Sequence, residues 1–324
     1  MGDVAMTVPV LSAFSNAYPT IKLKVLTKKQ FVPLFRDLKM VTVISADFNT
    51  TYKGIFGLYR LFKLVRNTHI EAIADLHNVL RTKILKLFLS GIKFAQIDKG
   101  RAEKKALILG KAATPLKTTA QRYADVFRNL GFDFELDPPT FLEPKSLDAA
   151  TTKVLGNFSD ATIGIAPFAA YASKTYPISK MDQVILELQK ESKVLLFGGG
   201  SDEIKKLEKI ASKYANVFCV AGKFSLEQEL DVISNLKVML SMDSSNGHMA
   251  AIFGTNVVTL WGVTHPFAGF APFHQLTTNS LVSDLEKYPK IPTSIYGNKY
   301  PEGYEFAIHT ISVEKIIKTV KDNL

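Results

Sequence analysis

Short apolar runs alternate with longer amphipathic segments along most of this chain. Apolar runs bounded by polar or glycine residues are typical of buried strands, and apolar positions spaced three and four apart are typical of helices. The expected strands are residues 22–27, 41–45, 72–76, 161–166, 193–197, 217–220, 238–242 and 257–261, and the main expected helices are residues 30–37, 52–66, 80–88, 120–130, 204–214, 226–236 and 313–324. Strands that regularly lead into helices predict parallel sheets and an α/β fold.

The segment from Val238 to Pro266 holds the most informative polar residues. Its first strand ends at Asp243, small polar residues follow at 244–247, and a helical turn begins at His248. A helix start behind serines and a glycine offers N–H and O–H donors to an anion such as phosphate. Gly247 would let a ligand approach the backbone, and His248 can point at the same ligand. A helix capped by Ser244 or Ser245, with nothing bound, is an equally open interpretation.

The composition is that of a globular protein with two domains. The chain has 324 residues, 47% of them hydrophobic and 22% charged, and this length suits two domains of ordinary size. No apolar run approaches the ~20 residues that span a bilayer. The sequence starts without a basic segment and a long apolar core, and Cys219 is the single cysteine, so we expect a reducing, cytoplasmic setting.

The charge is uneven. Residues 1–155 contain 24 Lys and Arg against 13 Asp and Glu, a net charge of +11, whereas residues 156–324 contain 16 against 17, a net charge of −1. The first half should therefore meet an anionic partner. Residues 52–66, which are apolar and basic, form a helix that could lie on a membrane surface. The more common alternative is a half-buried helix with solvated lysines.

The second half resembles glycosyltransferase family 9, the ADP-heptose:lipopolysaccharide heptosyltransferases. The segments that carry the resemblance are GKFSL at 222–226, DSSNGHMAA at 243–251, GVTHP at 262–266 and SKTYP at 173–177. Two departures are Ser245, where the family has glycine, and His265, where the family has a small or acidic residue. The resemblance implies a nucleotide-sugar donor site, with Lys174 as a point charge on the diphosphate. The implied donor-binding residues are Lys174, Gly222, Lys223, Ser225, Asp243, Ser244, Ser245, Gly247, His248 and Thr264.

The first half carries weaker matches. Residues 2–9 resemble the family segment whose acidic residue is the proposed catalytic base, which makes Asp3 the implied base, although the family strand before that segment is absent here. Residues 75–82 resemble the family motif at the mouth of the first domain, and place His77 and Arg81 toward the acceptor. Asn78 stands where the family has glycine, at a position that should tolerate a left-handed backbone.

These observations lead to one hypothesis. The chain is expected to have a GT-B type fold: two Rossmann-like, doubly wound α/β domains facing across a cleft. The expected boundaries are 1–155 for the acceptor domain, with its first strand apparently missing, 156–308 for the donor domain, and 309–324 for a helix that returns to the first domain. The implied function is inverting transfer of a heptose from an ADP-sugar to a lipopolysaccharide core or lipid A acceptor.

The hypothesis also covers partners and alternatives. We expect no cofactor and no metal, because the histidines are scattered and no acidic pair accompanies the donor motif. A monomer that binds the inner face of the cytoplasmic membrane and no nucleic acid is expected. A nucleotide-sugar epimerase of the same architecture, or a nucleotide-sugar-binding homologue with impaired catalysis, remains as an alternative.

Overall fold

A computed structural model describes residues 1–158 and 161–324 of the chain. The contacts divide it into two compact units. Unit 1 contains residues 6–100 and 119–140 together with Met1, and unit 2 contains residues 2–5, 101–118 and the chain from Phe141 onward. The division differs from a boundary after residue 155, because residues 101–118 and 141–155 associate with the second unit. The expected second domain also included residues 159–160, which lie outside the described residues.

Unit 2 is built on a six-stranded parallel sheet with the strand order β10-β9-β8-β5-β6-β7. The strands are β5 (Thr162–Ala166), β6 (Lys193–Leu196), β7 (Val217–Cys219), β8 (Val238–Met242), β9 (Asn256–Trp261) and β10 (Ser280–Val282). Every residue of β5 and β8 is buried, as their continuous apolar sequences predict for strands covered on both faces.

Helices cover both faces of this sheet. They are α8 (Ile178–Leu188), α9 (Ser201–Ala211), α10 (Leu226–Ser234), α11 (Ser245–Ala251) and α12 (Val313–Lys321). Val238, Leu240 and Met242 of β8 share one core cluster with apolar side chains of α8, α9 and α12. The intervening residue Ser241 lies on the opposite face, against α11. Alternate side chains of one strand therefore serve two helical layers, which makes the sheet doubly wound.

Helix α12 packs on α8 within unit 2, and not on the first domain as the sequence suggested. Ile316 and Val320 of α12 are buried in the core cluster of the sheet, and Lys321 forms a 3.0 Å ion pair with Glu191 just beyond α8. The Tyr176 hydroxyl donates to the Ile311 carbonyl before the helix at 2.7 Å. An apolar stripe that matches α8 therefore keeps the C-terminal helix in its own unit.

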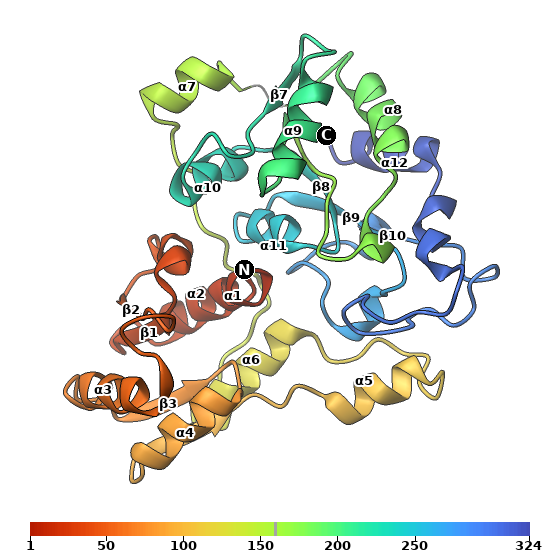
Figure 1. Ribbon diagram of the computed structural model, residues 1–324. Coiled ribbons are helices and arrows are strands. Elements are labelled where there is room, and N and C mark those ends of the chain that lie inside the picture. The colour runs from red at the N-terminus through yellow and green to blue at the C-terminus, as the bar shows by residue number, and fades with distance from the viewer. Residues whose placement is uncertain (159–160) are drawn as a thin grey trace. The chain divides into compact units, whose positions relative to one another are not determined.

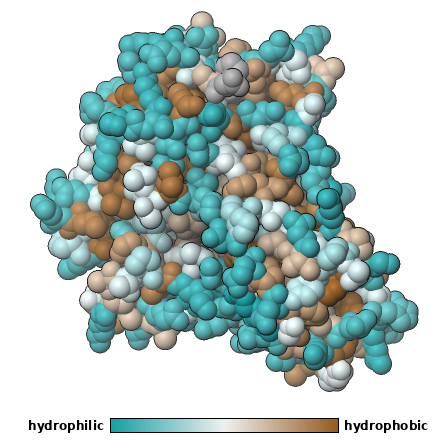
Figure 2. Space-filling model, turned by 180° about the vertical axis from the view of Figure 1, so that it is seen from behind, coloured by the Kyte–Doolittle hydropathy of each residue, from teal (hydrophilic) through white to brown (hydrophobic). Residues whose placement is uncertain are grey.

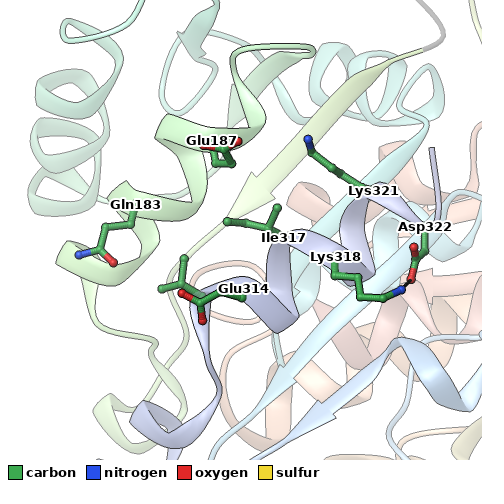
Figure 3. Close-up of a pocket in the computed structure, with 8 residues that line it drawn as sticks. Gln183, Glu187, Glu314, Ile317, Lys318, Lys321 and Asp322 are labelled. Carbon is green, nitrogen blue, oxygen red and sulfur yellow. Dashed lines mark hydrogen bonds and ion pairs between the residues drawn. The ribbon is translucent and has the colours of Figure 1, made fainter.

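A shallow hollow lies between α8 and α12 (Figure 3). Its walls come from these two helices and include Gln183, Glu187, Val313, Glu314, Ile317 and Lys318. Lys318 closes one end through a 2.6 Å ion pair with Asp322. None of the residues expected to bind the donor lines this hollow.

Unit 1 contains four strands that pair two by two. Strand β1 (Leu23–Thr27) pairs in parallel with β2 (Val41–Ser45), and β3 (Ala72–Asp75) pairs in parallel with β4 (Lys93–Gln96). Helices α3 (Gly54–Arg66) and α4 (Leu80–Phe88) lie side by side (Figure 1). They share one apolar cluster, to which Leu26 of β1 and Ile73 of β3 contribute. Both strand pairs are therefore covered by the same two helices.

A second group of apolar side chains in unit 1 joins α2 (Thr7–Ala17) to α6 (Thr119–Arg128). Phe14 stacks against Phe127 with 4.7 Å between ring centroids, and packs edge-on against Phe132 and Phe134. Aromatic pairs at such distances contribute stability beyond the area that they bury.

Several expected elements have the predicted type and bounds, among them β2, α4 and β8. The N-terminal segment is helical, as α1 (Gly2–Ala5) followed by α2. The charged residues from Arg101 onward form the helix α5 (Arg101–Ile108), which is not among the helices expected from the sequence. The remaining elements are α7 (Ala149–Leu155) and the 3-10 helices Lys29–Phe35, Ala172–Lys174, Pro266–Ala268, Thr277–Asn279 and Tyr304–Thr310. Within the described ranges, no helix is long and apolar enough to cross a membrane.

Candidate functional site

The candidate site of unit 2 begins where β8 ends. The strand continues to Met242, the Asp243 N–H donates to the Leu260 carbonyl of β9 at 3.3 Å, and Ser244 then turns the chain into α11 with an extended backbone. Ser244 occupies the N-cap position, but its hydroxyl makes no cap hydrogen bond. Its Oγ is buried without a partner among the described residues. The interpretation of a merely capped helix therefore fails for this serine, and its hydroxyl is available to a ligand.

Asp243 is the centre of a polar cluster at this edge of the sheet. The Lys174 ammonium donates to the Asp243 carboxylate at 3.1 Å and to its carbonyl oxygen at 2.9 Å. The Thr264 hydroxyl donates to the same carboxylate oxygen at 3.0 Å. Lys174 and Thr264 are buried, and Asp243 is half-buried. An ammonium has three donors, so Lys174 keeps one N–H for a further acceptor.

The position of Lys174 depends on close backbone approaches. A Cβ atom added at Gly262, which follows β9, would overlap the carbonyl oxygen of Ser173, and the Val263 N–H donates to that same oxygen at 3.4 Å. The Ser173 hydroxyl donates to the Gly297 carbonyl at 2.5 Å. A Cβ atom at Gly297 would come within 2.8 Å of the Lys174 side chain. Gly262 and Gly297 thus hold the lysine in place, a role that the sequence did not reveal for Gly297.

His248 is buried in α11 next to the N-terminal helix α1, which belongs to the same unit. A Cβ atom at Gly2 would lie 3.1 Å from the His248 ring, and Nδ1 of that ring has no partner among the described residues. Burial lowers the pKa of His248, and the carboxylates of Asp243 and Asp3 only partly oppose this effect. The imidazole is therefore neutral near pH 7. Asp3, whose side chain is exposed, lies in α1 and close enough to influence this ring.

Gly247 has a different role from the one expected. It is buried against the sheet, where an added Cβ atom would come within 2.6 Å of Ser241 Oγ and 3.2 Å of Val257. Its lack of a side chain serves helix–sheet packing, and not the close approach of a ligand. Ser245 is the first residue of α11 and is half-buried. The helix has only 7 residues, so side chains and not a helix dipole carry the candidate site.

The second expected donor segment lies between β7 and α10. Gly222 has a φ of +73°, in the left-handed region that favours glycine. Ser225 is the N-cap of α10, and its Oγ accepts from the Gln228 N–H at 3.3 Å while the Gln228 side chain accepts from the Ser225 N–H at 3.1 Å. This reciprocal capping box accounts for Ser225 without a ligand. Lys223 is exposed.

His265 is explained by the local fold. Its Nδ1 accepts the Phe267 N–H at 3.2 Å and so caps the short 3-10 helix that follows. Burial lowers the pKa of this histidine, which favours the neutral ring that such an acceptor requires. The departure from the family at this position is therefore structural.

The residues expected near the acceptor lie in unit 1. The Asp75 carboxylate at the end of β3 accepts the N–H groups of His77 at 3.0 Å and of Asn78 at 2.8 Å. Asn78 has a φ of +45°, which confirms the left-handed backbone predicted there. The Arg81 guanidinium lies over the Phe48 ring at 3.9 Å from its centroid. Asp75 thus shapes the loop that presents His77, and aromatic stacking orients Arg81.

Comparisons with known proteins define the class and the family in turn. The fold matches that of solved GT-B heptosyltransferases: it superimposes on a family 9 glycosyl transferase from Veillonella parvula DSM 2008 with a TM-score of 0.75 at 19% identity, covering 99% of this chain and 93% of that one. The Escherichia coli heptosyltransferase WaaC with ADP gives a TM-score of 0.68 at 18% identity, covering 100% and 97% of the two chains. The protein is therefore a glycosyltransferase in architecture.

The family follows from the sequence comparison. The model of glycosyltransferase family 9 (heptosyltransferase) matches residues 58–299, so the chain belongs to that family and is a glycosyltransferase enzyme. It is 24% identical over 296 residues to the lipopolysaccharide core heptosyltransferase OpsX of Haemophilus influenzae, covering 89% of this chain and 82% of the relative. It is 25% identical over 314 residues to the lipopolysaccharide heptosyltransferase 3 of Escherichia coli strain K12, covering 90% and 87%.

Proposed function

We propose that this protein transfers a heptose from ADP-heptose to the core of a lipopolysaccharide acceptor, with inversion at the anomeric carbon. The names of the family 9 relatives support the sugar and the acceptor class, and a solved family member contains ADP. The structural observation that carries the proposal is the Lys174–Asp243–Thr264 cluster beside the unpartnered Ser244 hydroxyl and His248 ring.

In this proposal the cluster binds the donor diphosphate. The remaining N–H of Lys174 and the Ser244 hydroxyl donate to phosphate oxygens, and Asp243 holds the ammonium in place. The neutral His248 donates or accepts one hydrogen bond without adding charge. Lys174 supplies the positive charge at the diphosphate, so the proposal requires no metal ion. Gly222, Lys223 and Ser245 complete the donor site on the strength of the family motif.

The proposed chemical step is a single displacement. The acceptor hydroxyl oxygen forms a bond to the anomeric carbon, the bond from that carbon to the diphosphate oxygen breaks, and its electron pair leaves with ADP. The hydroxyl proton passes to the Asp3 carboxylate as general base. The cluster at Lys174 stabilises the negative charge that develops on the departing diphosphate.

We assign the acceptor side to unit 1. His77 and Arg81 are proposed to contact the acceptor, and the guanidinium and the excess of basic residues in residues 1–155 suit an anionic acceptor. We also propose that the protein works as a monomer, and that the lipid-linked acceptor places it at the inner face of the cytoplasmic membrane.

Replacement of Asp3 tests the proposal most directly. Asp3→Asn keeps the shape and removes the base, so kcat for sugar transfer should fall about 10²–10⁴-fold, while calorimetry in the presence of a chelator should show unchanged ADP binding. Asp322→Asn, at an exposed carboxylate just after α12, is the matched control. Full activity of Asp3→Asn would overturn the assignment and make Asp75 and His77 the next candidates.

Product analysis tests the reaction class. Consumption of ADP-heptose should require the acceptor and should release ADP. Conversion of the donor into an isomeric ADP-sugar without acceptor would instead show an epimerase. Loss of ADP binding in the chelator would show that a metal ion is part of the donor site.

A further inference from the structure

Helices α3 and α4 of unit 1 combine exposed apolar side chains with basic ones. The buried face of α3 consists of Gly57, Leu58, Leu61 and Phe62. On its outer face Phe56 is 81% exposed, and Ile55 and Tyr59 are exposed beside it. A half-buried helix with solvated lysines, the alternative suggested by the sequence, would not place a phenylalanine at the centre of its outer face.

Helix α4 continues this composition. Leu80, Lys83 and Leu87 are spaced to share one stripe of the helix, and all three are exposed, Leu87 by 77%. The two helices lie next to each other, since Phe88 of α4 packs against Tyr59 and Phe62 of α3 at ring distances of 5.8 and 5.6 Å. Their outer faces therefore form one surface, here called the α3–α4 surface.

The charge of this surface has a single sign. Helix α3 carries Arg60, Lys63 and Arg66, helix α4 carries Arg81, Lys83 and Lys86, and neither helix contains Asp or Glu. In the part of the chain that the structure describes, Arg60, Lys63, Lys83 and Lys86 form no ion pair with a carboxylate. Lys63 and Lys86 lie over aromatic rings, at 4.9 Å from Tyr59 and 4.6 Å from Phe94.

Other exposed helices of the protein differ. Helices α9 and α12 present both acidic and basic residues to solvent, and none of their exposed residues is a large hydrophobic one. Figure 2 shows exposed hydrophobic residues among hydrophilic ones at its lower right, where the turn from the view of Figure 1 brings α3 and α4. Helices α9 and α12 thus lack the combination of exposed apolar and purely basic side chains that α3 and α4 share.

We propose that the α3–α4 surface docks on an anionic lipid bilayer. Phe56, Ile55, Leu80 and Leu87 enter the boundary between headgroups and acyl chains, and Arg60, Lys63, Lys83 and Lys86 contact headgroup phosphates. Apolar side chains interleaved with Lys and Arg and lacking acids are the pattern of a helix that lies in a membrane interface. A protein partner would have to supply an entirely acidic rim around an apolar centre, so the charge favours the bilayer.

Vesicle binding without nucleotide or acceptor tests this inference separately from the proposed function. The wild type should sediment with phosphatidylcholine vesicles that contain phosphatidylglycerol, and at least tenfold less with phosphatidylcholine alone. Binding should weaken as salt shortens the screening length from ~10 Å to ~3 Å. Equal binding to both vesicles would overturn the proposal.

Matched variants locate the contact. Phe56→Ser with Leu87→Ser should reduce binding at least tenfold, whereas Leu276→Ser with Phe306→Ser, at exposed apolar residues of unit 2, should not. Lys63→Glu with Lys83→Glu should also reduce vesicle binding at least tenfold. Lys205→Glu with Lys209→Glu, at exposed positions of α9, should leave vesicle binding unchanged. If the α9 variant loses as much binding, net charge alone is responsible and the surface has no special role.

A tryptophan reporter gives an independent measurement. The only native tryptophan, Trp261, is buried, so Phe56→Trp adds a single exposed fluorophore. Its emission should shift to the blue on anionic vesicles and be quenched by lipids brominated on the acyl chain, and that of Leu276→Trp should not. The proposal would be overturned if the protein did not bind vesicles but dimerised with rising concentration, and if Phe56→Ser abolished this dimerisation. That result would show that the surface joins two copies of the chain.

Discussion

The parallel strands of the two units differ in how far they are buried and in how many strands they pair with. In unit 2 every residue of β5 and β8 is buried, and six strands form one continuous sheet. In unit 1 the four strands form two separate pairs, in which only Thr27, Asp75 and Ala95 are buried. Each strand of unit 1 pairs with a single neighbour, and charged residues such as Lys24 and Lys93 interrupt its apolar positions, so these strands remain less covered.

This difference bears on how each unit holds its candidate residues. Asp243 and Thr264 follow central strands of the continuous sheet, and Lys174 is fixed by two close backbone contacts. His77 and Arg81 lie beyond a strand that pairs with a single partner. The residues proposed for the donor are therefore held by a well-packed sheet, whereas those proposed for the acceptor follow a less buried pair of strands.

Hydrogen exchange should give the largest contrast between the units. The amides of β5 and β8 should exchange only on global unfolding, and those of β1 and β3 should exchange on the order of 100-fold faster through local opening. Mass spectrometry of peptides from the intact protein measures both in one sample. Equal protection of the two sets would mean that the strand pairs of unit 1 are as stable as the sheet of unit 2.

Lys174→Ala should affect the donor side alone. Loss of a charge-assisted contact of about 1.5–3 kcal/mol should lower donor kcat/KM roughly 10–100-fold, with no change in vesicle binding. The variant also leaves the Asp243 carboxylate unpaired, which destabilises unit 2. The double variant Lys174→Ala with Asp243→Asn removes that penalty. Recovery of donor turnover in the double variant would show that the lysine is only structural.

Glycine replacements compare packing in the two units. Gly262→Ala forces a methyl group against the Ser173 carbonyl. Thermal unfolding should therefore show that the free energy of unfolding falls by about 1–3 kcal/mol, and ADP binding should weaken. Gly91 of unit 1 has a φ of +92° and open space around it. Gly91→Ala should therefore lower the free energy of unfolding by about 1–2 kcal/mol through backbone strain alone. ADP affinity that is unchanged in Gly262→Ala would mean that this contact does not position Lys174.

Burial of the Glu229 carboxyl group in α10 disfavours its charged form. Desolvation raises its pKa from 4.5 to about 7, so the folded state binds a proton that the unfolded state releases above pH 4.5. This contribution to stability is present below pH 4.5 and is lost as pH rises through about 7. Glu229→Gln should therefore stabilise the protein by about 1–3 kcal/mol at pH 8 and have little effect at pH 4.5. Denaturant unfolding at both pH values measures the difference, with Glu227→Gln as the control; an equal effect at both would contradict the raised pKa.

The sequence by itself determined much of the local structure. The continuous apolar runs located β5, β8 and β9 to within a residue or two, because a strand buried on both faces consists mostly of apolar residues. The resemblance to the family motifs also grouped five residues that are far apart in the chain into one hypothetical site: Lys174, Asp243, Ser244, His248 and Thr264. Helix α5 was missed because charged residues dominate its beginning, and its apolar end was not read as helical.

Only the tertiary structure decided which of these residues act together. A motif assigns a residue type to a position, but the ion pair of Lys174 with Asp243 depends on two segments separated by 69 residues. Gly247 shows the same limit, because the sequence cannot say whether a glycine faces a ligand or the neighbouring strand, and here it faces Ser241. The outer face of α3 was ambiguous for the same reason: which apolar residues of an amphipathic helix remain exposed depends on the elements that pack against it, and those are assembled only in the folded chain.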